Sequence, residues 1–577
     1  MKKFFYTLLP LLLVVAGCTK DPIVPDNAVI AIASNTGSFS FEIGAKITVS
    51  ATIDGKISTD INWRVASETS CVSFDKNTHE ILGVLDGTAT LYATSKYNSK
   101  VETYVDLIVG TVPASGNGYS IQGDYSVNNL QKLSGAYGMP TLPSLGETKL
   151  LVVPVELKDS AESQKWNKSE LQRLDNTFFG EAADADWESV SSYYYKSSYG
   201  KLNITGEIAP VLMMNETSDE LTAKHRTDSG DAPFFAADQF YSSPFATEEK
   251  LKEYDLDKDG LVDSVIFVYN TPESGDPFWA WVYWFDSTGP VSQLTNRSFY
   301  RANKTGKPGL STHMWASKNF MNEGYGSLGK GDAHTFIHET GHLLGLDDYY
   351  DYDNTSSPLG GRDMMDHNIA DHNPYSKMAL SWIKPYYVEG TQKVTTITIS
   401  TFAESEQFIL LNNNWNKTAL DEYLALELYT PTNLNYDDSL FSTRYTRGYT
   451  IPGVRVIHAD SRVGNTNSGI PTNTPSYSGS DYVLASNSPS WSSYPTPAER
   501  KANKLTRLIQ NGNKSTLLTS GSALAKDGDL FQTGNTLDTS NSVFFKNGKF
   551  NGGGTIGYKV YFVSVTATSA TIQFTKL

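Results

Sequence analysis

Cysteine is nearly absent from this sequence, whose 577 residues include only Cys18 and Cys71. Two cysteines cannot build a disulfide framework, and they cannot form a zinc cluster of several thiolates. Because a free cysteine packs like a small apolar side chain, we expect Cys71 to be a buried structural thiol. A fold held together by disulfides is therefore excluded.

Basic residues are outnumbered by acidic ones. Lysine and arginine total 47 against 63 aspartate and glutamate residues, which gives a formal net charge of −16. A nucleic-acid-binding surface needs clustered lysine and arginine opposite the phosphates. We therefore expect no nucleic-acid partner, and ordinary acidic solubility accounts for most of the excess charge.

The apolar run at the N-terminus, from Leu8 to Val15, is too short for a comfortable membrane span. It follows a basic start and precedes small residues, an order that is typical of a signal peptide over residues 1–18. The tetrapeptide that ends at Cys18, "VAGC", resembles a bacterial lipobox. In such signals the cysteine is acylated and becomes the mature N-terminus.

The lipobox resemblance implies an exported lipoprotein whose acyl chains hold it in a membrane. Thr19 stands where an aspartate would retain a lipoprotein at an inner membrane, which implies the outer membrane or the cell surface. The alternative is an ordinary signal peptide in which "AGC" occurs by chance.

The length predicts two to four domains, and the apolar patterning divides the chain. Residues 19–27 form a polar tether. Residues 28–112 alternate short apolar segments with turn residues, which predicts an all-β sandwich of immunoglobulin type. Within them "GVLDGTATLYATS" resembles bacterial Ig-like repeats. Residues 113–146 are expected to be a linker or a pro-segment.

Residues 147–385 show a different pattern. "KLLVVPVEL" is a continuous apolar run that predicts a buried strand, and "NKSELQRLDNTFFG" has the periodicity of an amphipathic helix. Alternation of such segments predicts an α/β domain, and this domain carries the candidate chemistry described next. Residues 386–577 return to alternating runs, which predict a C-terminal all-β domain.

One short segment carries metal-ligand spacing: His338, Glu339 and His342 spell H-E-x-x-H. Residues four apart lie on the same side of a helix, so both imidazoles can share one cation. Glu339, beside the first ligand, is placed to accept a proton from a water molecule whose pKa zinc lowers to about 7. The segment therefore predicts a zinc site with Glu339 as general base. A closed structural zinc site is the alternative, and it would leave Glu339 without a role.

The residues after the motif supply a candidate third ligand. Gly345 can end the helix in a left-handed conformation and reverse the chain, which brings Asp348 to the metal. Two nitrogens and one oxygen would leave the fourth zinc position open. Met365 follows after a glycine-containing loop, where metzincins place a Met-turn beneath the metal.

Other residues compete for the same role. Asp347 is one position from Asp348, and Asp371 and His372 follow the Met-turn. His372 is kept as an alternative ligand or a residue that lines the site. For His458, in "VIHAD", packing in the core and lining of the site are equally plausible.

At this point the sequence resembles the immune inhibitor A group of secreted bacterial metallopeptidases, whose catalytic domains are metzincin-like. The matching segments span about residues 140 to 460 and include "SYYYKSSYGKLNITGEI", "DLDKDGLVDSVIFVYN", "HETGHLLGLDDYYDY", "GRDMMD", "SKMALSWIKP", "EYLALELY" and "GVRVIHAD". The resemblance implies a zinc-dependent endopeptidase with His338, His342 and Asp348 as ligands. It departs from the family after the Met-turn, where His367, Asp371 and His372 replace a Gly/Ser-rich stretch.

A second metal loop is predicted upstream. "DLDKDGLVD" places carboxylates at positions 1, 3, 5 and 9 of a calcium loop with a glycine at the turn: Asp255, Asp257, Asp259 and Asp263. Ile266 replaces the glutamate of position 12, so the loop is not a complete EF-hand. We expect a structural calcium ion here, with an acidic surface turn as the alternative.

Together these features predict a membrane-anchored zinc endopeptidase that acts on extracellular proteins or peptides. The alternative is a surface adhesin or glycan-binding lipoprotein with an inactive peptidase-like domain. The complete H-E-x-x-H motif favours the enzyme, because a decayed site would not need to keep its base.

Overall fold

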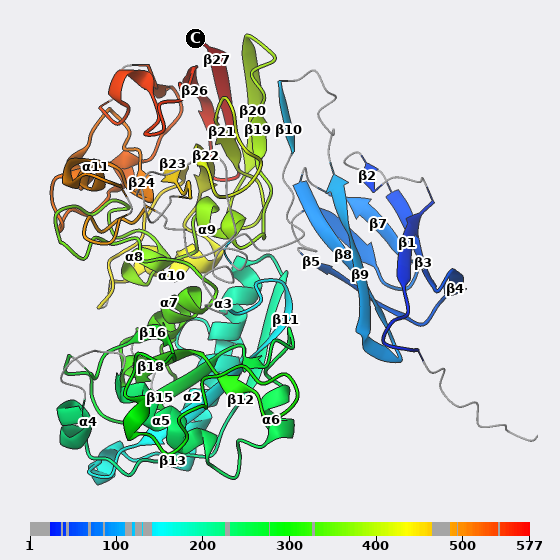
Figure 1. Ribbon diagram of the computed structural model, residues 1–577. Helices are drawn as coiled ribbons and strands as arrows, with labels where there is room; N and C mark the ends of the chain where they lie inside the picture. The colour runs from blue at the N-terminus through cyan, green and yellow to red at the C-terminus, as the bar shows by residue number, and fades with distance from the viewer. Residues whose placement is uncertain are drawn as a thin grey trace, which may run out of the picture.

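The computed structural model describes residues 24–577 apart from 36–38, 42–45, 67–70, 85–86, 110–117, 122–129, 131–140, 225–230, 276, 326–328, 443, 464–484, 493 and 541–542. The signal-peptide and lipobox predictions, with Cys18, lie outside the described residues. Figure 1 shows three units along the chain: an N-terminal β unit, a central α/β unit and a C-terminal β-rich unit. The predicted multidomain, sheet-rich architecture is therefore confirmed.

The N-terminal unit packs two sheets around one apolar core. One sheet contains β1 (Ile30–Ser34), β3 (Lys46–Ile53), β7 (Glu80–Gly83) and β6 (Val72–Asp75), with β4 (Lys56–Ser58) beside β3. The other contains β2 (Ser40–Phe41), β9 (Asn98–Val109), β8 (Gly87–Ser95) and β5 (Ile61–Ala66). Alternate residues of β3 face inward, as the period of two requires. Cys71 is buried in this core, as expected.

The central unit is built on one mixed sheet. Its order is β12 (Leu202–Ile208), β11 (Gly146–Glu156), β15 (Val265–Tyr269), β18 (Thr312–Ser317) and β16 (Trp281–Trp284), with β13 (Leu212–Met213) also beside β11. The first four strands run parallel, and β16 is antiparallel at the edge. β14 (Leu261–Val262) and β17 (Gly309–Leu310) form a separate pair.

Helices cover both faces of this sheet, which explains the unbroken apolar run of β11. Leu150 and Val152 face a core shared with α2 (Lys168–Phe179), α3 (Val190–Ser197) and α7 (His334–Leu343). Leu151 and Val153 face the opposite core, shared with α4 (Ser218–Lys224), α5 (Asp231–Tyr241) and α6 (Glu248–Lys252). A parallel strand buried on both faces needs apolar residues at every position.

The C-terminal unit packs two further sheets. One has the order β10 (Tyr119–Ile121), β19 (Tyr386–Val388), β21 (Ile409–Leu411), β22 (Glu422–Tyr429), β23 (Gly453–Asp460) and β24 (Thr506–Leu508). The other has the order β20 (Val394–Ser400), β27 (Ser569–Lys576), β26 (Tyr558–Val565) and β25 (Thr536–Asp538). Short helices connect or flank these sheets: α8 (Met364–His367), α9 (Pro374–Ala379), α10 (Tyr436–Leu440) and α11 (Pro497–Ala502).

The central and C-terminal units share one core. Met378 of α9 packs in the same fully buried cluster as Tyr423 of β22 and Ile457 of β23, and this cluster includes α7. The stretch expected to be a linker or pro-segment also enters both units. Its β10 pairs with β19 of the C-terminal unit. Later in the same stretch, the backbone N–H of Leu142 donates to the carbonyl of Leu343 at the end of α7 in the central unit (2.8 Å).

Polar contacts join the N-terminal unit to the other two. The Arg64 guanidinium donates to the Gly200 carbonyl (3.0 Å), and Lys384 pairs with Asp106 (2.7 Å). The N-terminal unit thus contacts both the end of α3 and the segment that leads into β19.

Candidate metal centre

The centre is built on α7, which runs beneath the edge of the central sheet. Asp332 accepts the backbone N–H of His334 (3.0 Å) and so satisfies one unpaired donor of the first turn. The helix ends at Leu343, and two residues later the chain turns at Gly345, whose φ is +98°. Its N–H donates to the His342 carbonyl, and the next N–H, of Leu346, donates to Gly341. This Schellman-type ending reverses the chain toward the helix face that carries the histidines.

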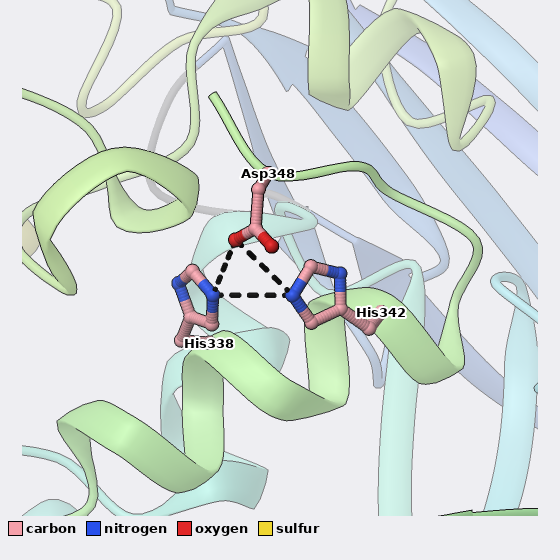
Figure 2. Close-up of side chains that lie close together, drawn as sticks. All are labelled: His338, His342 and Asp348. Carbon is pink, nitrogen blue, oxygen red and sulfur yellow. Dashed lines mark hydrogen bonds and ion pairs between the residues drawn. The ribbon is translucent and has the colours of Figure 1, made fainter. Parts of the chain in front are cut away.

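Three side chains converge where the chain turns back (Figure 2). Nε2 of His338 lies 2.9 Å from Oδ1 of Asp348, Nε2 of His342 lies 3.3 Å from the same oxygen, and the two nitrogens are 3.1 Å apart. Ligands of one tetrahedral zinc ion stand about 3.3 Å from each other. The predicted set of His338, His342 and Asp348 is therefore brought together at metal-ligand spacing.

Hydrogen bonds of the two Nδ1 atoms, which point away from the centre, determine that both Nε2 atoms face it. Nδ1 of His338 donates to the carbonyl of Met364 (2.8 Å), and Nδ1 of His342 donates to the carbonyl of Leu346 (2.8 Å). A carbonyl can only accept, so each Nδ1 carries the proton and each Nε2 presents a lone pair to the centre. Two lone pairs and a carboxylate oxygen within 3.3 Å of each other repel unless a positive charge lies among them. The donor set thus fits a divalent zinc ion.

Charge coupling at the centre favours a positive charge beside Asp348, which a proton on His342 or a cation can supply. Burial disfavours the charged form of His342, but the Asp348 carboxylate outweighs it and raises the pKa of His342 to about 10. Burial opposes ionisation of Asp348 as well, yet His342 and His338 hold its pKa well below the usual range. The arrangement favours an ionised carboxylate together with a positive charge between the rings.

Glu339 is buried beside the ligands, with 6% of its surface exposed. Its Oε2 has no hydrogen-bond partner among the described residues. Burial raises the pKa of this carboxyl, and the neighbouring His342 and His338 offset the effect only in part. Burying a carboxylate without a hydrogen-bond partner costs free energy of folding. The position of Glu339 beside the ligand group therefore suits a role in the reaction.

The predicted Met-turn packs directly under α7. A Cβ built at Gly341 would lie 2.5 Å from Sδ of Met365, so only glycine lets the methionine approach this closely. The carbonyl of Met365 accepts the N–H of Tyr349 (2.7 Å), which ties this turn to the segment that carries Asp348.

Two tyrosines of this segment complete the centre, and sequence reasoning assigned them no role. The Tyr352 hydroxyl donates to Oδ2 of Asp348, the carboxylate oxygen that faces away from the histidines. The Tyr350 ring lies nearly parallel to that of His338, with centroids 6.4 Å apart. The sequence feature that could have indicated their role is the tyrosine-rich "DDYYDY" shortly after Gly345.

The competing ligands lie elsewhere. Asp347 is exposed, and its carboxylate accepts the backbone N–H of Asp348 (2.9 Å). Asp371 is paired with Lys377 (2.6 Å). His372 is fully buried among the rings of Tyr193, Tyr194 and Trp382, so it neither joins the ligand group nor lines the cavity beside it.

His458 lies in the core of the C-terminal unit. Its Nε2 is 2.9 Å from a carboxylate oxygen of Glu422, and its Nδ1 accepts a hydrogen bond from Arg507 (2.9 Å). Its ring also stacks on that of Phe550. Of the two roles considered for His458, the structure shows core packing.

The predicted calcium loop precedes β15. Carboxylate oxygens of Asp255, Asp257 and Asp259 lie within 4.8 Å of one another. Asp263 is buried beside them, and burial together with the neighbouring carboxylates raises its pKa to about 8. Gly260, at φ +90°, packs against the backbone of Asn303 so closely that a Cβ would lie 2.6 Å from it. The loop therefore gathers three of the four predicted carboxylates, whereas Asp263 accepts the backbone N–H of Leu256 (3.2 Å).

A cavity of about 400 Å³ opens beside His338 and Glu339. Its walls come from the central unit and from the C-terminal unit, including Trp279, Phe320, Glu323, Arg444 and Tyr445. The contribution of the C-terminal unit was not foreseen, because no local spacing relates residue 444 to residue 339.

A link between units anchors the N-terminal turn of α7. His334 holds Asp332 through Nδ1 (2.6 Å) and Asp438 of α10 through Nε2 (3.3 Å). Asp438 also accepts the N–H of Ala370 (2.6 Å), just past the Met-turn. The C-terminal unit thus holds two elements of the metal centre in place.

Comparison with known proteins leaves the family of the chain open. No protein-family model and no curated protein matches it. One similar solved structure is a crystal structure of an intimin mutant from EHEC O157:H7, with 13% identity and a TM-score of 0.12. That match covers 20% of this chain and 61% of the intimin chain. In the described part of the chain, no helix is both long and apolar enough to cross a membrane.

Proposed function

We propose that the protein is a zinc-dependent endopeptidase, carried on an exported lipoprotein, that hydrolyses extracellular proteins or peptides. The observation that carries this proposal is the convergence of two imidazole lone pairs and a carboxylate beside a buried, unpaired glutamate. This combination suits metal-assisted hydrolysis, and the open cavity gives a substrate access to it.

His338, His342 and Asp348 would hold the ion. Zinc, when bound, would polarise the scissile carbonyl and acidify the attacking water. Glu339 would accept a proton from the attacking water and return it to the leaving amine. Burial raises the pKa of Glu339, which favours the protonated form that the second step needs.

The edge strand β16 can pair with the backbone of an extended substrate. This strand is at the edge of the central sheet, and α7 contacts it. An extended peptide can add to such an edge through backbone hydrogen bonds. The residues just before β16, Trp279 and Ala280, line the cavity, so a peptide along this edge would pass Glu339.

The finer assignments belong to the same proposal. Gly345, the turn around Met365 and the ligand pattern support a metzincin-like central domain related to the immune inhibitor A group. The two-sheet N-terminal unit supports an Ig-like spacer, and the acidic loop around Asp257 supports a structural calcium ion.

The test uses the full-length protein in detergent. We expect one zinc ion per chain by elemental analysis, hydrolysis of casein, and loss of hydrolysis on chelation with recovery when zinc returns. A zinc-loaded protein that cleaves neither casein nor a mixed peptide library would contradict the proposal. It would favour the alternative of an adhesin with an inactive peptidase-like domain.

A further inference from the structure

The cavity beside Glu339 lies toward the N-terminal end of α7. Thr335, His338 and Glu339 line it from one side of the helix. If a scissile carbonyl reaches Glu339, as the proposed function requires, one of the two residues that flank the scissile bond must place its side chain in this cavity. The cavity walls therefore decide which side chains are accepted.

Two aromatic rings form one wall. Trp279 precedes β16, and Phe320 lies in the short 3-10 helix Lys318–Asn322 after β18. The rings meet edge to face with centroids 5.8 Å apart. Phe320 is buried, whereas Trp279 is 46% exposed at the rim. This wall can cover the methylene stem of a long side chain and attract a cation through the ring faces.

Two carboxylates share one cation at this wall: Glu323 lines the cavity, and Glu273 contacts Arg444 from outside the lining. Arg444 forms an ion pair with Glu323, and its guanidinium also lies 3.7 Å from Oε1 of Glu273. The other oxygen of Glu273 is buried and has no hydrogen-bond partner within the part of the chain that the structure describes. Two carboxylates thus share one guanidinium, which leaves one negative charge uncompensated.

Deeper in the wall, Glu323 shares a hydroxyl donor with Asp332. The Tyr445 hydroxyl lies 3.0 Å from Oε2 of Glu323 and 3.0 Å from Oδ2 of Asp332. One phenol proton can serve only one of these carboxylates. Two other acidic residues of the cavity, Asp351 and Asp366, are paired with Lys504 and His367.

We propose that this cavity is a specificity pocket for a lysine or arginine side chain next to the scissile bond. The methylene stem packs on Trp279 and Phe320, the charged head donates to Glu323, and Glu273 adds a second negative charge beside Arg444. A substrate cation buried here supplies a second positive charge for the two carboxylates that share Arg444. This inference rests on the proposed function, because it assigns the substrate class of that same site.

Matched peptides test the pocket. Quenched fluorescent peptides that differ only at one residue beside the cleaved bond would carry lysine, arginine, norleucine, leucine or glutamate. We expect kcat/KM for lysine and arginine to exceed that for norleucine by about 10-fold, the factor for about 1.4 kcal/mol. Norleucine is the sharp comparison, since it keeps the stem and removes the charge.

Variants assign the preference to the wall. Glu323→Gln and Glu273→Gln should each lower kcat/KM for the lysine peptide by about 10-fold and leave the norleucine peptide nearly unchanged. The control Glu253→Gln, at the exposed residue that follows α6, should change neither. Both glutamate variants are tested so that the result does not depend on a single variant that fails to fold.

The outcomes separate this inference from the proposed function. Equal rates for lysine and norleucine, with casein still hydrolysed, would overturn the pocket and leave the peptidase in place. If no peptide is hydrolysed, calorimetric binding of the same lysine and norleucine peptides decides the pocket on its own. If the lysine peptide binds more tightly than the norleucine peptide, and Glu323→Gln removes this difference, the result supports the pocket. Equal binding of the two peptides by the wild type overturns the pocket.

Discussion

Asp347 and Asp348 are adjacent carboxylates with opposite surroundings. Asp348 is buried against both histidines, whereas Asp347 is exposed and caps its neighbour's backbone N–H. We predict that Asp348→Ala weakens zinc binding by about two orders of magnitude or more and abolishes hydrolysis without unfolding the protein. Asp347→Ala, the matched control, should keep most of both. Competition for zinc with a chromophoric chelator gives the affinities.

One result would contradict the ligand assignment. If Asp348→Ala keeps full zinc affinity while His372→Ala loses it, the ion is held from the far side of the Met-turn. The buried position of His372 among aromatic rings predicts instead that His372→Ala affects stability and leaves zinc affinity largely intact.

The grouping of three candidate ligands could be predicted because its geometry is local. His338, His342 and Asp348 lie on one helix and the turn that ends it, so spacing alone places them. Arg444 and Asp438 reach the same region from the C-terminal unit. Their positions depend on how β22, β23 and α10 pack against the central unit, and no periodicity in the sequence encodes that.

At the scale of elements, the fit of α7 on the Met-turn rests on Gly341. An added methyl group would overlap Sδ of Met365, so Gly341→Ala should lower the free energy of unfolding by about 1–3 kcal/mol. In the background of Met365→Ala the same substitution should cost little, because the sulfur is gone. Urea unfolding of both single variants and the double variant measures this coupling. Additive effects would mean that the two residues do not touch.

The acidic loop before β15 is a second element with a testable role. Calcium should raise the unfolding midpoint of the wild type. At a free calcium concentration of 100 times Kd, the free energy of unfolding should increase by about 2.7 kcal/mol. Asp257→Ala should lose most of this effect, because one of the three grouped carboxylates is removed. Excess zinc is kept in all samples so that the zinc site stays saturated. If calcium shifts neither midpoint, the loop is an acidic turn.

Elements with strong patterns were easier to predict than the connections between them. The apolar run of β11 and the periodicity of α2 are local signals, and both elements are present. The pairing of β10 with β19 joins residues more than 260 positions apart and could not be read from the linker sequence. The same holds for the core that α9 shares with β22 and β23.

At the scale of the whole molecule, His334 couples the central and C-terminal units. Burial opposes its charge, but Asp332 and Asp438 raise its pKa to about 10. A raised histidine pKa stabilises the fold fully below about pH 6.5, and this contribution is lost as the pH rises through 10. We predict that wild-type stability falls by up to about 5 kcal/mol across this window.

Two variants isolate the contribution of His334. His334→Gln should remove most of the difference between pH 6.5 and 10, and Asp438→Asn should make the wild-type slope shallower, because one of the two carboxylates is neutralised. Urea unfolding at several pH values gives the slopes. A slope that is unchanged in both variants would mean that His334 is neutral in the folded protein.

The central claim is that Glu339 acts as the base beside a zinc ion held by its neighbours. Its most direct test is the Glu339→Gln variant of the full chain, with zinc content and hydrolysis of one peptide measured on the same sample. The account predicts one zinc ion per chain and a kcat lower than that of the wild type by about two to four orders of magnitude. Near-normal hydrolysis in the zinc-loaded variant would contradict it.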